Sequence, residues 1–435
     1  MSNKSKYRLE TECVQAGYSP GNGEARVLPI YQSTTYKYDS ADDVADLFDL
    51  KAAGHMYSRI SNPTVEALEQ KIAILEGGVG AIVTSSGQAA ITLAVLTICG
   101  AGENFIAMSN LYGGTINLFS STLPKFNIEP RFVNYGRSEA ARAVNAEEIA
   151  SLVDSNTKFI YAETIGNPGV EVLDIEWLAD IAHSHGLPLI VDNTFATPYL
   201  CKPFEYGADV VVHSSTKYMD GHATSVGGLI VDKGNLNLWT NGKFSCLTDP
   251  DPSYHELSYT EAFGNAAFIT KARVVYVRDF GVLMSPMNAW LTNLGMETLS
   301  VRMDRHSENA LEVAKFLESH DCVEWVAYPG LDASLDKSLA GKYLKKGAGG
   351  VISFGVKGGL AAGKKFIDAL ELISLVVHVA DVRSHVLHPA SMTHRQLSEA
   401  QQLAAGIKPE QVRLSVGIEN VQDIIEDLDR ALRRN

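Results

Sequence analysis

Short apolar runs alternate with stretches of helical spacing through the middle of the chain. The runs predict strands at 81–83, 105–108, 159–162, 189–191, 210–212 and 229–231. Between several of them lie segments such as 175–185, in which apolar residues recur with the period of an α-helix. Alternating strands and helices are typical of βα units that wind a mostly parallel sheet. We therefore expect an α/β central region.

The two ends of the chain depart from this alternation. Residues up to about 55 show no clean period, which predicts an extended arm. A helix should begin at the Asn62 cap and Pro63 and end at Gly77. Beyond 271, a long helical region to 317, a strand at 350–355 and helices at 362–373 and 421–432 predict a smaller α+β lobe. The expected divisions are 1–60, 61–270 and 271–435.

Composition narrows the classes of function. The 435 residues are 46% hydrophobic and 20% charged, as in globular proteins with more than one core. A net charge of −14 without a basic cluster argues against nucleic acid or an anionic membrane as a partner. The longest apolar stretch, 89–101, is too short to span a bilayer, and the N-terminus lacks a signal peptide pattern. Five scattered cysteines fit reduced thiols, so we expect a cytoplasmic protein.

The first candidate for chemistry is a lysine just beyond a predicted strand. Ser214, Thr216 and Lys217 follow the run 210–212, at the carboxyl end of a strand, where open α/β sheets bind ligands. A partly buried lysine there can form a Schiff base with an aldehyde cofactor, and the two hydroxyls can hold a phosphate. Taken alone, an ordinary solvated lysine is the commoner case.

Three further features favour the cofactor hypothesis. Asp192 ends another predicted strand and could pair with a protonated pyridine nitrogen, although a capping aspartate is commoner. Ser86, Gly87 and Gln88 open a helix whose amides could bind phosphate; the alternative is a turn that needs glycine. Tyr112 could stack on a planar cofactor and exchange a proton, or simply lie at the edge of the core.

Together the motifs resemble the cystathionine-metabolising (Cys/Met metabolism) family of pyridoxal 5'-phosphate (PLP) enzymes. They occur in family order over nearly the whole chain: Tyr57-Ser58-Arg59, Ser86-Gly87, Tyr112-Gly113, Glu163 to Pro168, Asp192, Ser214 to Lys217 and Arg413 to Gly417. The resemblance implies PLP as cofactor and the aspartate aminotransferase-like fold (fold type I). It places PLP in the domain at 61–270.

The resemblance also implies a role for each matched residue. Lys217 would carry PLP, Asp192 would pair with the ring nitrogen, and Tyr112 would stack on the ring. The residues implied to bind the phosphate are Ser86, Gly87, Gln88, Ser214 and Thr216, and Asn167 would meet the phenolic oxygen. Arg413 and Ser384 would bind the substrate carboxylate, although a surface ion pair is the plain alternative for Arg413.

Subunit contacts are implied as well. In the family, residues matching Tyr57 and Arg59 reach the phosphate of the neighbouring subunit's cofactor, and Tyr57 also lies near the substrate. The arm at 1–60 should therefore cross an interface, and the expected assembly is a tetramer made of two dimers.

The stretches 54–59, 249–255 and 388–391 resemble the subgroup that acts on O-acetyl-L-homoserine. The implied reaction is a γ-replacement in which sulfide or methanethiol displaces acetate and gives L-homocysteine or L-methionine. A γ-lyase acting on methionine or cystathionine shares these residues. Methionine γ-lyases typically carry Cys where this chain has Gly114, which favours the γ-replacement.

The main departure from the subgroup pattern lies at 378–385, where glycine is replaced by Ala380 and the backbone could differ. This loop should line the substrate mouth, so the choice between acetyl and succinyl substrates, and between sulfide and methanethiol, stays open. His385 could contact substrate or lie at the surface. The remote alternative is a metal-binding protein that uses His378, His385, His388 and His394 with Asp381, but their spacing matches no compact metal motif, and we expect no metal.

Overall fold

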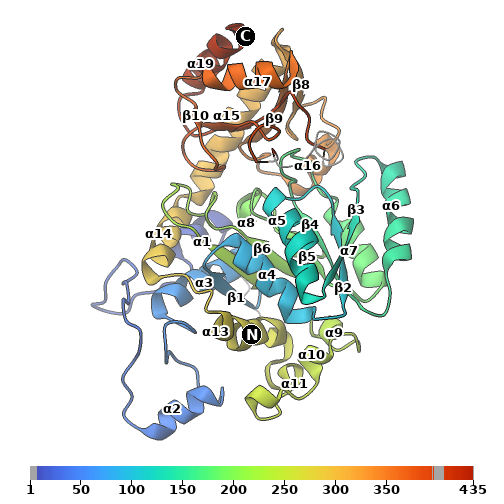
Figure 1. The fold of residues 1–435 in the computed structure, drawn as a ribbon. Helices are drawn as coiled ribbons and strands as arrows, with labels where there is room; N and C mark the ends of the chain where they lie inside the picture. Colours follow the sequence, from blue (N-terminus) through green and yellow to red (C-terminus); the bar gives the residue numbers. More distant parts are fainter. Residues whose placement is uncertain (1–6, 394, 396–405, 435) are drawn as a thin grey trace.

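The computed structural model describes residues 7–393, 395 and 406–434. Its elements gather around two sheets, a larger one in the lower part of Figure 1 and a smaller one above it. The larger sheet has the order β1-β7-β6-β5-β4-β2-β3. Its strands are β1 (Gly80–Thr84), β2 (Asn104–Met108), β3 (Glu129–Val133), β4 (Thr157–Glu163), β5 (Leu189–Asp192), β6 (Val210–His213) and β7 (Gly228–Asp232).

This sheet confirms the expected α/β architecture. β7 runs antiparallel to its neighbours β1 and β6, and the other adjacent pairs are parallel. Successive residues of a strand enter two separate cores: Ile106 and Met108 join one apolar cluster, whereas Phe105 and Ala107 join the other. Burial on both faces explains why the strands appear in the sequence as unbroken apolar runs.

Helices cover both faces of the larger sheet. They are α3 (Pro63–Glu76), α4 (Gly87–Ile98), α5 (Gly113–Asn117), α6 (Glu139–Leu152), α7 (Ile175–Ser184) and α8 (Thr197–Leu200). The side chain of Asn62 caps α3 by accepting the Thr64 N–H at 3.0 Å, and the helix ends at Gly77 in the left-handed conformation, both as the sequence predicts. Short helices follow β7: α9 (Leu236–Trp239), α10 (Ser245–Thr248), α11 (Tyr259–Phe263), α12 (Ala267–Lys271) and α13 (Arg278–Phe280).

Short segments of tighter or wider helix complete this region. The 3₁₀ segments are Leu123–Phe126, Pro203–Tyr206, Pro252–Tyr254 and Gly264–Ala266, and the π segments are Leu118–Thr122 and Ala272–Val277.

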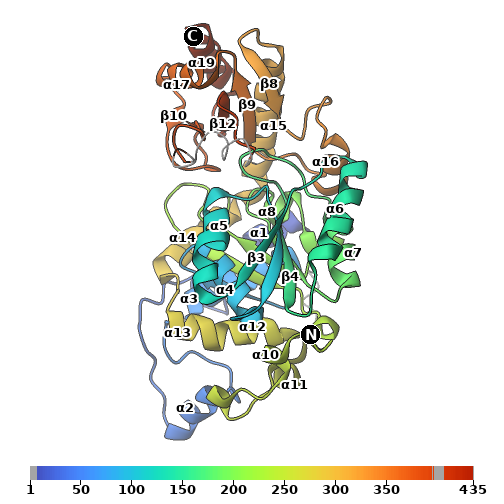
Figure 2. The same ribbon diagram turned by 45° about the vertical axis from the view of Figure 1, so that its right-hand side comes forward.

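The smaller sheet has the order β10-β11-β12-β9-β8. Its strands are β8 (Val323–Ala327), β9 (Val351–Val356), β10 (Ser374–Leu375), β11 (His385–Leu387) and β12 (Gln411–Ser415), and its helices are α16 (Lys337–Tyr343), α17 (Gly359–Asp368) and α19 (Val421–Arg433). It is reached through α14 (Pro286–Glu297) and the long α15 (Leu299–Ser319), which runs from the lower region to the upper one in Figures 1 and 2. The central strand β12 carries Arg413.

The N-terminal region is less extended than its sequence predicts. It contains α1 (Leu9–Gln15) and α2 (Ala41–Phe48), joined by irregular chain that loops away from the sheet in Figures 1 and 2. With seven and eight residues, each helix has only about two turns, too few for an apolar period to stand out. The prediction of an extended arm is therefore wrong for these two segments.

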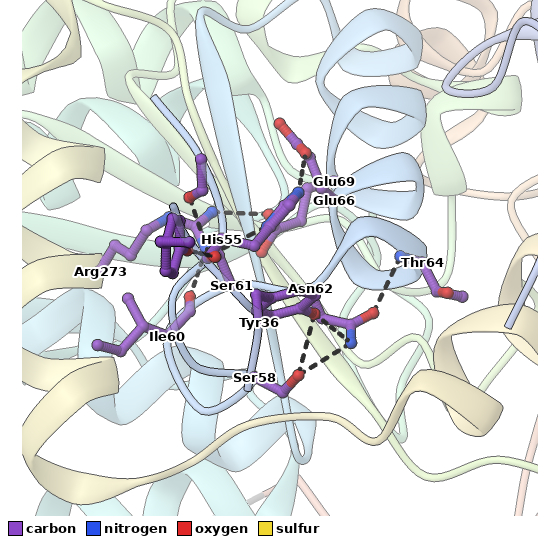
Figure 3. A network of polar contacts seen from close by, with 12 residues as sticks. Tyr36, His55, Ser58, Ile60, Ser61, Asn62, Thr64, Glu66, Glu69 and Arg273 are labelled. Carbon is purple, nitrogen blue, oxygen red and sulfur yellow. Dashed lines mark hydrogen bonds and ion pairs between the residues drawn. The ribbon is translucent and has the colours of Figure 1, made fainter. Parts of the chain in front are cut away.

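The end of this region is fixed to α3 by the polar network of Figure 3. Asn62 donates to the hydroxyls of Tyr36 and Ser58 at 3.1 and 3.0 Å. Arg273 donates to the Ile60 carbonyl at 3.1 Å and pairs with Glu69 at 2.7 Å. The network anchors the segment on both sides of the Tyr57-Ser58-Arg59 motif. Within the described parts of the chain, every helix is too short or too polar to cross a membrane.

Candidate active site

A cavity of about 260 Å³ opens at the carboxyl ends of the central strands. Asp192 ends β5, Ser214 follows β6, and Gly87 starts α4 just after β1. Ten of the residues singled out in the sequence line this one cavity: Ser86, Gly87, Gln88, Tyr112, Asn167, Asp192, Ser214, Thr216, Lys217 and Arg413.

The start of α4 forms one wall of the cavity. The Ser86 hydroxyl caps the helix by accepting the Ala89 N–H at 3.1 Å, which leaves the earlier amides of Gly87 and Gln88 without partners inside the helix. A Cβ at Gly87 would lie 2.7 Å from the Ser214 Cβ, so only glycine allows this close approach. Helix amides facing the Ser214 and Thr216 loop suit an anionic group such as a phosphate.

Lys217 lies on the loop that leaves β6. Its side chain is partly buried, and burial, followed by the charge of Arg413, lowers the pKa of Lys217 to about 8. Its Nζ lies 3.4 Å from Nδ1 of His378. The lowered pKa raises the share of neutral amine, which is the form that acts as a nucleophile or a base.

Asp192 is a partly buried carboxyl group with neutral hydrogen-bond partners. Its Oδ1 accepts the Thr194 N–H at 2.9 Å and its Oδ2 accepts the Tyr161 hydroxyl at 3.4 Å. Burial raises the pKa of Asp192. A cationic ligand atom at this carboxyl group would favour its charged form.

Arg413 reaches the cavity from β12 in the smaller sheet. It is buried, and its guanidinium donates to Asn167 Oδ1 at 3.0 Å and to the His378 carbonyl at 3.1 Å. Burial lowers the pKa of Arg413 to about 10, so the group stays charged at neutral pH. A buried cation with neutral partners suits an anionic ligand.

Tyr112 stands at the mouth of the cavity, with 48% of its surface exposed. Its backbone N–H donates to the Glu163 carboxylate at 2.7 Å, which fixes the loop before α5. A Cβ at Gly114 would lie 2.5 Å from Cε1 of the Tyr112 ring. The ring position therefore depends on glycine at 114.

Three predicted site residues do not line the cavity of this chain. The Ser384 hydroxyl donates to Glu419 at 3.0 Å and accepts the Gly417 N–H at 2.8 Å. Arg59 donates to the carbonyl of Arg278 and lies over the Tyr57 ring, 5.6 Å from its centre. Their roles toward substrate or a neighbouring subunit stay predictions.

Comparison with known proteins decides the family. The profile of the Cys/Met metabolism PLP-dependent enzymes matches residues 10–433. The chain belongs to this family. It is a PLP-dependent enzyme with the fold that the sequence predicts.

Several relatives match over nearly their whole length. O-acetyl-L-homoserine sulfhydrylase of Leptospira meyeri is 46% identical, covering 98% of this chain and 97% of the relative. Homocysteine synthase of Schizosaccharomyces pombe is 44% identical, covering 98% of each chain. A crystal structure described as an O-acetylhomoserine (thiol)-lyase of Campylobacter jejuni carries a pyridoxyl-lysine phosphate. It matches with a TM-score of 0.93 and 37% identity, covering 98% of this chain and 100% of that one.

The cavity fits the cofactor of this family. It brings together a lysine amine with a lowered pKa, a partly buried carboxyl group bonded to the Thr194 N–H and the Tyr161 hydroxyl, and helix amides facing two hydroxyl-bearing residues. These groups match the aldehyde, the ring nitrogen and the phosphate of PLP.

Some cavity residues went unassigned in the sequence. Thr194, two positions after Asp192, lines the cavity and its Oγ1 accepts the Ser214 N–H at 2.8 Å. Glu163 ends β4 at the same edge of the sheet, and burial, followed by the charge of Asp192, raises its pKa. Both lie at the carboxyl ends of strands, Glu163 as the last residue of β4 and Thr194 just after β5, and this position is the signal that could have identified them.

The histidine-rich segment has a defined arrangement. His378 and His385 stack with ring centres 5.6 Å apart, whereas His388 contacts the Ser391 hydroxyl at 3.0 Å. The fourth histidine, His394, lies outside the described residues. Over residues 7–393, 395 and 406–434, no group of three His, Cys, Asp or Glu side chains is placed to hold a metal ion. Ala380 keeps the left-handed backbone, with φ of 68°, that a glycine would favour.

Proposed function

We propose that this enzyme catalyses a γ-replacement on O-acetyl-L-homoserine. Sulfide or methanethiol takes the place of acetate, and the product is L-homocysteine or L-methionine. The observation that carries the proposal is the cavity shared by Lys217, Asp192 and Arg413, which combines an amine of lowered pKa, a partly buried carboxyl group and a buried cation. The names of the relatives in Leptospira meyeri and Schizosaccharomyces pombe support this choice of reaction.

We assign the cofactor contacts residue by residue. Lys217 would hold PLP covalently, Asp192 would pair with its ring nitrogen, and Tyr112 would cover its ring. The phosphate would be bound by Ser86, Gly87, Gln88, Ser214 and Thr216, and the phenolic oxygen by Asn167. PLP, when bound, supplies an electron sink for negative charge that develops at the substrate carbon atoms.

The proton transfers fall to Lys217. With its amine free, Nζ takes the proton from the α-carbon and then moves a proton at the β-carbon. Acetate leaves from the γ-carbon, and the sulfur of the acceptor forms its bond there before Lys217 returns the protons. The lowered pKa of Lys217, about 8, supports this double role as base and acid. Paired with the cationic ring nitrogen, Asp192 would stay charged, because that cation would offset the effect of its burial.

Arg413 would hold the substrate α-carboxylate with its two terminal nitrogens. Their present hydrogen bonds to Asn167 Oδ1 and the His378 carbonyl would be replaced by bonds to the charged carboxylate. The role of Ser384 would be to orient that carboxylate. The Ser384 hydroxyl is hydrogen-bonded to Glu419 and to the Gly417 N–H, both in the chain that follows β12. These bonds support an indirect role, in which Ser384 positions that part of the chain.

The assembly we propose is a tetramer of two dimers in the cytoplasm. Tyr57 and Arg59 lie at the end of the N-terminal arm, outside the cavity of their own chain, which supports a role at the phosphate of a neighbouring subunit and, for Tyr57, near its substrate. We keep the division of the chain into the arm at 1–60, the PLP-binding domain at 61–270 and the C-terminal domain at 271–435. The separation of the two sheets supports it.

The position of Gly114 supports γ-replacement over γ-elimination. Methionine γ-lyases typically carry Cys there, and a Cβ at this position would collide with the Tyr112 ring as it stands. The Tyr112 ring could not keep its present position if residue 114 were the cysteine typical of methionine γ-lyases.

A substrate panel tests the proposal. O-acetylhomoserine, O-succinylhomoserine, methionine and cystathionine are each supplied with sulfide and with methanethiol. The released acetate or succinate, the homocysteine or methionine formed, and ammonia and α-ketobutyrate are measured. We expect acetate release coupled to sulfur incorporation. Ketoacid formation from methionine without acetate exchange would contradict the reaction that we propose.

The variant Lys217→Ala tests the site. It should lose turnover and the visible absorbance of the bound cofactor, whereas Lys337→Ala, a half-exposed lysine in α16, should keep both. A Lys217→Ala enzyme that retained both properties would refute the assignment of the cofactor lysine.

A further inference from the structure

The imidazole of His378 lies against the amine of Lys217. Its Nδ1 is 3.4 Å from Nζ, and both residues line the same cavity. His378 belongs to the loop between β10 and β11, whereas Lys217 follows β6 in the larger sheet. The contact therefore joins the two sheets at the reacting amine.

The surroundings of His378 keep its ring neutral and in place. Burial, followed by the charges of Lys217 and His385, lowers the pKa of His378 to about 4, although Asp381 and Asp220 act in the opposite direction. The ring stacks on His385 at 5.6 Å. When Lys217 is protonated its ammonium can only donate, so Nδ1 of the neutral ring accepts in this contact. The ring hydrogen then lies on Nε2, which is buried without a hydrogen-bond partner among the described residues.

The backbone of the same residue is also held. The His378 carbonyl accepts the Arg413 guanidinium at 3.1 Å, and two residues later the Ala380 N–H donates to the Ser415 hydroxyl at 2.8 Å. Both partners belong to β12, the central strand of the smaller sheet. His378 is thus supported by a rigid element on one side and a stacked ring on the other.

We propose that His378 is a positioning residue for Lys217. Nδ1 of His378 accepts a hydrogen bond from Nζ of Lys217 and holds the amine in the cavity while the amine is free to move protons. This inference rests on the proposed function, in which Lys217 performs the proton transfers. A lysine amine sits on a flexible four-carbon stem and adopts many rotamers unless an acceptor fixes it. Proton transfer requires that the base lie within hydrogen-bond reach of the carbon-bound proton.

The test compares two substitutions at one position. His378→Phe keeps a planar ring but removes the acceptor, whereas His378→Asn offers an amide oxygen near the place of Nδ1. His385→Phe is the matched control, because phenylalanine keeps a ring that can stack on His378 and leaves the contact between His378 and Lys217 in place. Melting temperatures establish that each full-length variant is folded. If His378→Phe does not fold, His378→Leu replaces it in the same comparison.

Two readouts are needed, one of them independent of turnover. The first is the proton affinity of Lys217 in the cofactor-free protein, from the pH dependence of its reductive methylation by formaldehyde, located by peptide mass spectrometry. The second is the separate measurement of kcat and KM. Removal of the His378 acceptor destabilises the ammonium form of Lys217. The affinity of the Lys217 amine for a proton should therefore be about tenfold lower in His378→Phe than in the wild type. It should also show a kcat lower by about tenfold or more with KM little changed.

The results separate this inference from the proposed function. Recovery of both readouts in His378→Asn, with His385→Phe like the wild type, would support the positioning role. Unchanged readouts in His378→Phe, or equal losses in His378→Phe and His385→Phe, would overturn it. If Lys217→Ala remains active, the proposed function itself fails, whatever the His378 variants show.

Discussion

Replacing Arg413 with glutamine tests how the cavity recognises the substrate carboxylate. The guanidinium is buried, and its two hydrogen bonds go to the neutral oxygens of Asn167 and the His378 main chain. Burial lowers the pKa of Arg413 to about 10, so the guanidinium stays charged at neutral pH. The substrate carboxylate would then be the first charged group to accept a hydrogen bond from it in the cavity. Glutamine removes the charge and one arm of the fork but keeps a donor.

The size of the effect follows from this geometry. Truncating one partner of a buried, hydrogen-bonded charge pair costs about 2–5 kcal/mol, and we take about 2–3 kcal/mol because glutamine still donates once. That range corresponds to a fall in kcat/KM of about 30- to 150-fold. The carboxylate is held before and during the reaction, so most of the loss should appear as a higher KM for O-acetyl-L-homoserine.

The assay follows acetate release at saturating sulfide, and inhibition by L-homoserine and by 3-aminopropanol, which lacks the carboxylate. The control is Arg302→Gln. Arg302 is another buried arginine whose pKa burial lowers to about 10, but its guanidinium binds the Tyr218 and Gly295 carbonyls away from the cavity. We expect both variants to lose stability and only Arg413→Gln to lose affinity for L-homoserine. Equal weakening of both inhibitors, or an unchanged KM in Arg413→Gln, would refute the assignment.

Two further predictions concern packing and proton uptake. Gly114→Ala places a Cβ 2.5 Å from the Tyr112 ring, so PLP titration should show about 3- to 10-fold weaker binding of the cofactor. In the control Gly341→Ala, the new Cβ meets open space, and PLP binding should not weaken. Equal PLP affinities of the two variants would contradict the role of the ring. Burial raises the pKa of Asp232 from 3.8 to about 7. The folded state therefore holds a proton that the unfolded state releases, and the free energy of unfolding falls as pH rises from about 4 to 7. In urea titrations across this range, Asp232→Asn should lose that part of the slope; parallel curves for variant and wild type would count against it.

Local features of the fold could be predicted because their causes are local. Strands buried on both faces appear as apolar runs, and Asn62 with Pro63 marks the start of α3. The edge strand β3 was not predicted, because only one of its five residues is buried and partial exposure leaves no apolar run. The two short helices of the N-terminal arm were missed for lack of length.

The sequence by itself determined the candidate residues at strand ends, because the carboxyl edge of a parallel sheet gathers whatever follows each strand. Lys217 and Asp192 were found in this way. Only the tertiary structure decided which distant residues come into contact at the cavity: His378 lies 161 positions from Lys217, and Arg413 lies 246 positions from Asn167. Such contacts depend on how the second sheet packs against the first, and no local pattern of hydrophobic and polar residues encodes that packing.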